Sequence, residues 1–295
     1  MMAPGRRHGA GARLRWCGVA LSLALASAPL ASAPLAAQRN VDLRSVPISR
    51  VDTLLAWGRL AAAEQALYAA VEARPRAPEA RGALAWYLAS RARFGISDVL
   101  FTEALRFGAD SGAVRRARAT IAPWTVRHDG AEVTVPFVFA EDARTIGSFE
   151  MQVDGAPLRA VLDPNASGVS VRTAAVARTA GRGISVGART LPRPRVTVDA
   201  RVPEGEIRLG LDVLWGHAPV FDEVRGTLTL PARGTPPRVM EPAERIPFVL
   251  TMPGLWLVLR PGVAPAPVES PQGRVLLRGS RWRVDAEASV FVIER

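Results

Sequence analysis

The stretch from Gly147 to Ser170 constrains the fold more than any other part of this sequence. Apolar and polar residues alternate up to Val153 and again from Leu158 to Leu162, which is the period of a half-buried β-strand. Between the two runs stands Asp154-Gly155, a pair typical of a two-residue hairpin turn. The stretch therefore predicts a β-hairpin whose second strand ends at Asp163.

The residues after this predicted hairpin favour a tight turn that begins with a carboxylate. Asp163 is followed by Pro164, Asn165, Ala166 and Ser167. Proline fixes its own φ for a turn, and asparagine tolerates the left-handed conformation that glycine usually takes. We expect the Asp163 side chain to be held at a strand end, where a ligand can reach it.

A second stretch, from Glu206 to Leu230, has a matching organisation. It contains an apolar segment with Gly210, then Asp212, and then a predicted hairpin that turns at Arg225-Gly226. Its order and spacing relative to the first stretch carry more weight than either motif alone.

Together the two stretches resemble the retropepsin-like (aspartyl protease) family, especially its bacterial secreted members. In that family a strand pair leads into Asp-Thr-Gly-Ala-Ser, which corresponds here to Asp163 through Ser167. Some tens of residues later comes Ile-Leu-Gly-x-Asp-x-Leu, which places Gly210 and Asp212 at the matched positions. The resemblance covers residues 131–233 and implies an all-β, closed barrel-like domain over residues 123–233.

The resemblance also implies a site for peptide-bond hydrolysis that needs neither a cofactor nor a metal. Aspartic protease chemistry uses two facing carboxyl groups that share a proton, and this chain supplies one candidate, Asp163. The pair would form across the two-fold axis of a homodimer, with a peptide or protein as substrate. Pro164 lacks the hydroxyl and N–H of the family's threonine, and Asn165 carries a side chain where the family has glycine. The alternative is an inactive module in which the helices or the β-domain bind an envelope protein.

The N-terminal residues 1–37 predict a secretory signal peptide. Arginines without acidic residues precede an apolar run from Val19 to Ala26, and small residues up to Ala37 suit cleavage. The expected location is therefore secreted or periplasmic. The single cysteine, Cys17, lies within this segment, so a thiolate nucleophile and a cysteine-ligated zinc site are excluded from the mature chain. The sequence has no lysine, which also excludes a Schiff base.

The charge balance favours acidic envelope surfaces over nucleic acid. The formal net charge is +11, and removal of the four signal-peptide arginines leaves 11 − 4 = +7. The arginines are scattered, and the tight cluster of Arg115, Arg116 and Arg118 has no interleaved aromatic residues, which is typical of a solvated helix face. After the signal peptide, no apolar run is long enough to span a membrane.

Residues 38–122 resemble TPR-like helical repeats. Leu60, Ala63, Leu67 and Ala70 follow the helical period and Pro75 ends the helix. Residues 78–110 repeat this theme with two further helices. One and a half to two units are short for an independent solenoid. The helices therefore either form a partner groove or cap the β-domain.

The C-terminal residues 234–295 predict a β-extension that follows a linker at residues 235–237. Its expected strands are residues 246–250, 255–259, 274–277 and 284–293. The two interpretations are a module that completes the sheet and a degenerate second protease-like lobe.

The remaining polar candidates are histidines and arginines outside the two motifs. His128 and His217 are expected to be surface or hydrogen-bonded histidines, and no Gly-x-Ser-x-Gly elbow supports a serine nucleophile at Ser167. The chain switches from helix to strand before the strand predicted for residues 132–139, in which Pro136 favours an edge strand or a bulge. Arg182 or Arg189 would bind a substrate carboxylate if its loop covered the site, and exposed arginine is the alternative.

Overall fold

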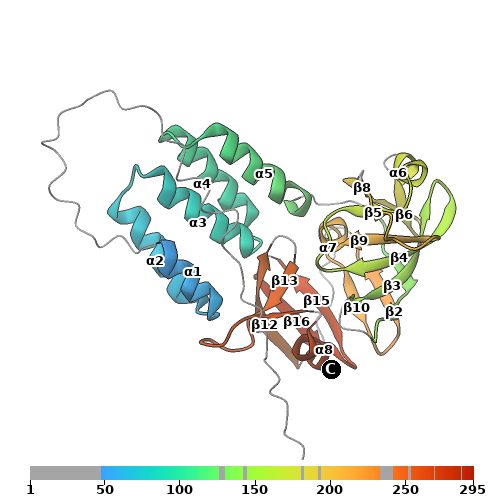
Figure 1. The fold of residues 1–295 in the computed structure, drawn as a ribbon. Helices are drawn as coiled ribbons and strands as arrows, with labels where there is room; N and C mark the ends of the chain where they lie inside the picture. Colours follow the sequence, from blue (N-terminus) through green and yellow to red (C-terminus); the bar gives the residue numbers. More distant parts are fainter. Residues whose placement is uncertain are drawn as a thin grey trace, which may run out of the picture.

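The computed structural model describes residues 48–125, 130–141, 145–180, 183–191, 194–232, 242–251, 254–268, 270–286 and 288–295. The predicted signal peptide, the linker at residues 235–237, His128 and Arg182 lie outside these residues. In the described part the chain is an α+β protein, with helices first and a mostly β region after them (Figure 1). None of the helices in this part is both long and apolar enough to cross a membrane.

The described part of the N-terminal region is helical, as the helical period predicts. These helices are α1 (Ile48–Ala56), α2 (Leu60–Ala73), α3 (Pro78–Ser90), α4 (Phe94–Arg106) and α5 (Ser111–Thr125). Pro78 is the first residue of α3, where its missing N–H costs nothing. The Tyr87 hydroxyl of α3 donates to the Leu60 carbonyl and lies 3.1 Å from a Glu64 carboxylate oxygen, which joins α3 to α2.

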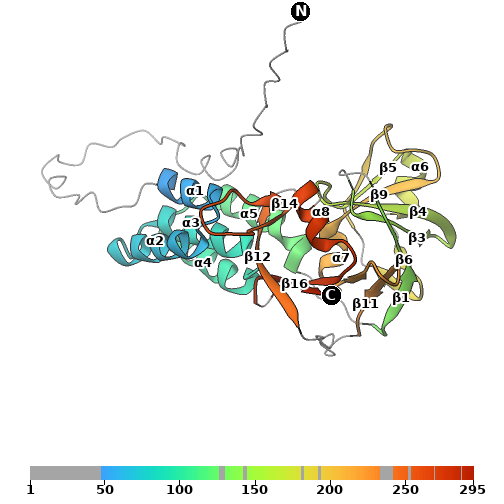
Figure 2. The ribbon, with the colours of Figure 1, turned by 90° about the horizontal axis from the view of Figure 1, so that it is seen from below.

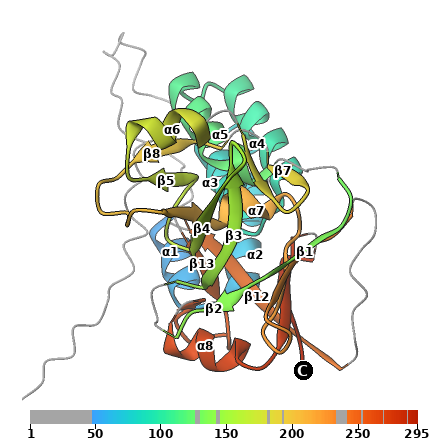
Figure 3. The ribbon, with the colours of Figure 1, turned by 90° about the vertical axis from the view of Figure 1, so that its right-hand side faces the viewer.

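The first sheet is a half-barrel whose described strands run in an open path rather than a closed ring. Its spatial order is β7 (Arg189–Leu191), β6 (Ile184–Val186), β3 (Gly147–Val153), β4 (Ala156–Asp163), β9 (Glu206–Gly210), β5 (Val169–Val171) and β8 (Val196–Val198), with β2 (Val138–Phe139) pairing with β3. Helix α6 (Ala174–Ala180) packs beside β5 and β8 (Figure 3). The predicted hairpin is confirmed, with positive φ at Asp154 and Gly155.

The second sheet joins the closing hairpin of the β-region to the C-terminal strands. Its order is β1 (Val133–Pro136), β11 (Thr227–Leu230), β10 (Val220–Asp222), β15 (Arg281–Asp285), β16 (Val290–Glu294), β12 (Ala243–Thr251), β13 (Gly254–Leu257) and β14 (Ala266–Pro267). Strand β15 pairs directly with β10. The C-terminal strands therefore extend this sheet, and they lie between the helices and the half-barrel (Figures 1 and 2).

Two sequence-based expectations for strands have different outcomes. Pro136 was expected to mark an edge or a bulge, and β1 is indeed the edge of its sheet. The strand expected at residues 274–277 is wrong, because these residues belong to helix α8 (Pro271–Leu277). Ser270 begins this helix by accepting a hydrogen bond from the Gly273 N–H at 3.2 Å, and Pro271 is its first residue.

One continuous core connects the helices to both sheets. Trp124 of α5 lies edge-on against Trp215 of helix α7 (Leu211–Trp215), with ring centroids 5.1 Å apart. Trp215 in turn lies edge-on against Phe248 of β12 at 5.8 Å. The side chain of Arg91, the residue directly after α3, donates to the Ser289 carbonyl at 2.9 Å. The helices thus pack on the β-region, as the capping interpretation expects.

Candidate functional site

The Asp163 turn is positioned by strand β9, which lies between the two strands that the turn connects. Strand β9 runs parallel to β4, with Asp163 opposite Gly210, and antiparallel to β5, with Val169 opposite Leu209. The turn from β4 to β5 must therefore cross the end of β9. This topology brings the two sequence motifs, 45 or so residues apart, into direct contact.

Asp212 is hydrogen-bonded to the end of the Asp163 turn, at Ser167 and Gly168. Its carboxylate accepts a hydrogen bond from the Ser167 hydroxyl at 2.9 Å and from the Gly168 N–H at 3.0 Å. The Asp212 residue is only 3% exposed. Burial raises its pKa above the usual 3.8, and the hydrogen bonds from Gly168 and Ser167 oppose that rise. The sequence matched Asp212 to the family motif, and the structure assigns it this supporting position.

Gly210 is required by close packing rather than by an unusual backbone conformation. Its φ is −71°, which any residue can adopt. A Cβ at this position would lie 2.6 Å from the Ala166 carbonyl oxygen and 2.9 Å from the Ser167 Cα. Only a residue without a side chain allows the turn to lie this close to β9.

The Asp163 carboxylate has partners of its own, and neither is a second carboxyl group. One oxygen accepts a hydrogen bond from the Asn165 N–H at 2.9 Å, which is the usual bond of an Asx turn. The other lies 3.9 Å from a guanidinium nitrogen of Arg208 on β9. The Asp163 side chain is 16% exposed, so the carboxylate is reachable from solvent. In the single chain it is thus a turn-forming group with a cationic neighbour.

The other residues of the turn differ in exposure. Pro164 is buried, whereas Asn165 and Ser167 are exposed and Ala166 is half-buried. The Ser167 hydroxyl donates to the Asp212 carboxylate rather than to a histidine, so the described residues do not form a Ser-His-Asp site here. In the described ranges, no group of three or more His, Cys, Asp or Glu side chains could hold a metal ion.

Arg189 and His217 are buried structural residues. Arg189 is 4% exposed, and its guanidinium donates to the carbonyls of Pro231, at 3.0 Å, and Ala131. The Nδ1 atom of His217 lies 3.4 Å from the same guanidinium. Arg189 therefore faces the protein interior, and the expectation that it is either exposed or directed at a substrate is wrong. His217 agrees with a hydrogen-bonded rather than a surface histidine.

A large cleft opens between the helices and the second sheet, and we call it the helix–sheet cleft. Its volume is about 1240 Å³. It is lined by Ala92, Arg93, Phe94, Gly95, Ile96, Asp98, Arg118, Ile121, Ala122, Thr125, Trp215, Gly216, Ala218, Pro219, Arg283, Val284, Asp285 and Ala286. Asp163 does not line it, nor does it line the second described cavity of about 550 Å³ beside α8.

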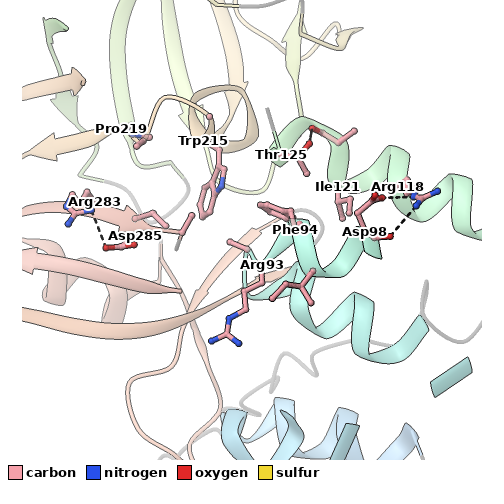
Figure 4. A pocket seen from close by; sticks show the side chains of 18 residues that line it. Arg93, Phe94, Asp98, Arg118, Ile121, Thr125, Trp215, Pro219, Arg283 and Asp285 are labelled. Carbon is pink, nitrogen blue, oxygen red and sulfur yellow. Dashed lines mark hydrogen bonds and ion pairs between the residues drawn. The ribbon is translucent and has the colours of Figure 1, made fainter. Parts of the chain in front are cut away.

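The walls of the helix–sheet cleft combine an apolar centre with charged ends. Figure 4 shows Phe94 and Trp215 facing each other across its middle. One end carries Arg118, whose guanidinium is 2.6 Å from an Asp98 carboxylate oxygen, and the opposite end carries Arg283 beside Asp285 at 3.7 Å. Such a mixed lining suits a ligand that has both apolar and polar groups.

Sequence reasoning missed this cleft because its walls come from distant segments. Residues 92–98 and 118–125 belong to the helical region, while residues 215–219 and 283–286 belong to the β-region. No local motif marks any of them. The only available signal was Trp215, a large aromatic residue directly after the second family-like motif.

Comparison of the chain with protein-family models, with curated proteins and with solved structures finds no match in any of the three.

Proposed function

We propose that this chain is a secreted or periplasmic binding module that holds peptide segments in the helix–sheet cleft without cleaving them. Its β-region is retropepsin-like and its N-terminal helices are TPR-like. The observation that carries the proposal is the cleft itself, with about 1240 Å³ and an apolar centre between charged ends. That volume exceeds the usual range of about 300–1,000 Å³ for small-molecule pockets and suits several residues of an extended chain.

The retropepsin-like part of the proposal is supported by topology and by the two motifs. The Asp163 turn crosses the end of β9, and Gly210 and Asp212 of the second motif lie directly beneath it. The half-barrel around the turn is also consistent with a barrel-like family fold. Helices α2, α3 and α4, of 13 or 14 residues with short connections, support the TPR-like part.

The chemistry of the Asp163 turn supports binding over catalysis. A general base in an aspartic protease needs a second carboxyl group to share its proton. Here the Asp163 oxygens lie against an N–H group and a guanidinium, and Pro164 provides neither N–H nor hydroxyl.

A second candidate function is a homodimeric aspartic peptidase. It is favoured by the accessibility of the turn: Asp163 is reachable from solvent, and Asn165 and Ser167 beside it are exposed. A partner chain that docked on this face would bring a second Asp163 opposite the first. Hydrolysis that depends on Asp163 would distinguish this candidate from the binding module.

The expected result for the binding module is that an obstruction in the cleft weakens peptide capture. Ala122 lies on α5, is exposed and lines the cleft, so Ala122→Trp places a bulky ring at the cleft wall without replacing a buried residue. Binding of reduced and alkylated α-lactalbumin, measured by biolayer interferometry, should weaken by about tenfold or more. The matched control is Ala62→Trp, the same change at an exposed position of α2 outside the cleft. Equal binding by both variants would contradict the proposal.

A further inference from the structure

The polar groups around the helix–sheet cleft are unevenly satisfied, and the imbalance indicates the charge of its ligand. The acceptors are already occupied: Asp98 is bonded to Arg118 at 2.6 Å, and Asp285 accepts from the Ala288 N–H at 3.0 Å. Two buried donors are not. In the described part of the chain, the indole N–H of Trp215 and the Nε–H of Arg283 have no hydrogen-bond partner. Native proteins rarely leave such groups unpaired.

Of these two unpaired donors, the indole N–H of Trp215 is the stronger indication of a ligand. The residue is only 3% exposed, and its indole projects from the sheet side toward Phe94 on the opposite wall (Figure 4). Its neighbours Trp124 and Phe248 present aromatic rings and offer no hydrogen-bond acceptor. An acceptor that enters the cleft would satisfy this donor.

The N-terminus of α4 adds further donors at the same place. The N-cap residue Arg93 and the first three residues of this 13-residue helix, Phe94 to Ile96, all line the cleft. The first N–H groups of a helix have no partner within it, and here neither a capping side chain nor an acidic residue in the first turn replaces that partner. The end of the helix therefore carries a partial positive charge directed at an anion.

The apolar centre lies next to these donors. Phe94 contributes both a helix-terminal N–H and a ring in the cleft wall, and Ile121 and Val284 continue the apolar surface. A ligand that uses both features must present a carboxylate and an apolar side chain on one face. In an extended peptide, residues i and i+2 share a face about 7 Å apart.

From this donor excess and apolar centre we infer that the helix–sheet cleft takes an extended acidic peptide segment in which Asp or Glu stands two residues from a large apolar side chain. The carboxylate accepts hydrogen bonds at the α4 N-terminus and from the Trp215 indole N–H, and the apolar side chain packs on the cleft wall that Phe94 forms. The inference rests on the proposed binding function and adds the chemistry of the segment that is bound.

The test uses peptides blocked at both ends and carrying the same dye, so that a side-chain carboxylate is the only charge that differs between them. The probe is a rhodamine-labelled nonapeptide with Glu-Ser-Leu at the centre of a Ser-Gly background, and binding to the mature chain is followed by fluorescence anisotropy. Its analogue with Gln-Ser-Leu should bind about tenfold more weakly, because bonds to charged acceptors are roughly twice as strong as neutral ones. The analogue with Glu-Ser-Ser should also bind more weakly. Equal affinity for all three peptides would overturn the inference.

A second test, independent of the peptide series, changes the protein at the α4 N-terminus. Nothing lies within 4 Å of a Cβ added at Gly95, so Gly95→Asp fits and places an anion at the start of α4. An acidic residue there also stabilises a helix, so the variant should unfold at the same or a higher temperature. We expect Gly95→Asp to bind the Glu-Ser-Leu peptide about tenfold or more weakly than the wild-type chain does. Gly95→Ala should bind it with unchanged affinity. Unchanged binding by Gly95→Asp would overturn the inference.

The two proposals fail in different ways. If Ala122→Trp blocks capture of α-lactalbumin while Gly95→Asp does not, the cleft binds peptides but not through an acidic group. If neither change affects capture, the cleft is not the binding site and both proposals are wrong.

Discussion

Asp212→Ala should lower the free energy of unfolding by about 3 kcal/mol, because it removes the group that holds the Asp163 turn. The Asp212 carboxylate accepts from the buried Gly168 N–H and from the Ser167 hydroxyl, and the residue itself is 3% exposed. Without it the Gly168 N–H is left buried and unpaired. Urea unfolding of the mature chain, followed by tryptophan fluorescence, measures the loss.

The matched variant Asp212→Asn distinguishes the hydrogen bonds of the Asp212 side chain from the effect of its negative charge. An asparagine oxygen can accept from Gly168 N–H, and its amide can donate to Ser167, so the loss should be only about 1 kcal/mol. Because burial raises the pKa of Asp212, the folded state binds the proton more tightly than the unfolded state does. The stability that this proton contributes is present at acidic pH and disappears as pH rises through the raised pKa. The decrease in the free energy of unfolding caused by Asp212→Asn should therefore be larger at acidic than at neutral pH. A loss from Asp212→Ala no larger than that from Asp212→Asn at every pH would contradict the structural role.

Gly168→Ala should destabilise the protein by about 2–5 kcal/mol, since backbone strain and overpacking add. Gly168 has φ +70°, which an L-residue with a side chain rarely adopts. A Cβ there would also lie well inside van der Waals contact with the Arg195 carbonyl oxygen. That oxygen accepts the Val169 N–H at 2.8 Å, so it cannot move away without breaking the start of β5.

Gly155→Ala is the control for this prediction, because it shares the strain but not the contact. Gly155 has φ +77° in the β3–β4 turn, and nothing lies within 4 Å of its added Cβ. Its expected cost is about 1–2 kcal/mol, the strain alone. If the two alanine variants unfold at the same urea concentration, the close packing of the Asp163 turn against Arg195 is wrong.

Features encoded by neighbouring residues were predictable from the sequence. Asp154-Gly155 predicts the β3–β4 hairpin because both residues tolerate positive φ, and the structure has them at +55° and +77°. The wrong strand prediction at residues 274–277 also came from a local pattern, one that was ambiguous. A short apolar run does not distinguish strand from helix, and the deciding signal was Ser270-Pro271, an N-cap followed by a proline at the first helical position.

Features that depend on non-local pairing were not predictable in the same way. The sequence identified Asp163, Gly210 and Asp212, but it did not show that Asp212 supports the turn or that Arg208 lies beside Asp163. Both facts follow from the position of β9 between β4 and β5. Arg189 looked like an exposed arginine because nothing local marks the carbonyls of Ala131 and Pro231 that surround it.

The measurement that tests the central claim most directly is mass spectrometry of reduced and alkylated α-lactalbumin after incubation with the folded mature chain, from acidic to neutral pH. Asp163→Asn is the matched variant, since its side-chain oxygen can still accept the Asn165 N–H that Asp163 accepts. The account predicts that the wild-type chain binds the substrate and leaves it intact at every pH, and that the variant behaves identically. Cleavage by the wild-type chain that disappears in the folded variant would contradict it and establish the homodimeric peptidase instead.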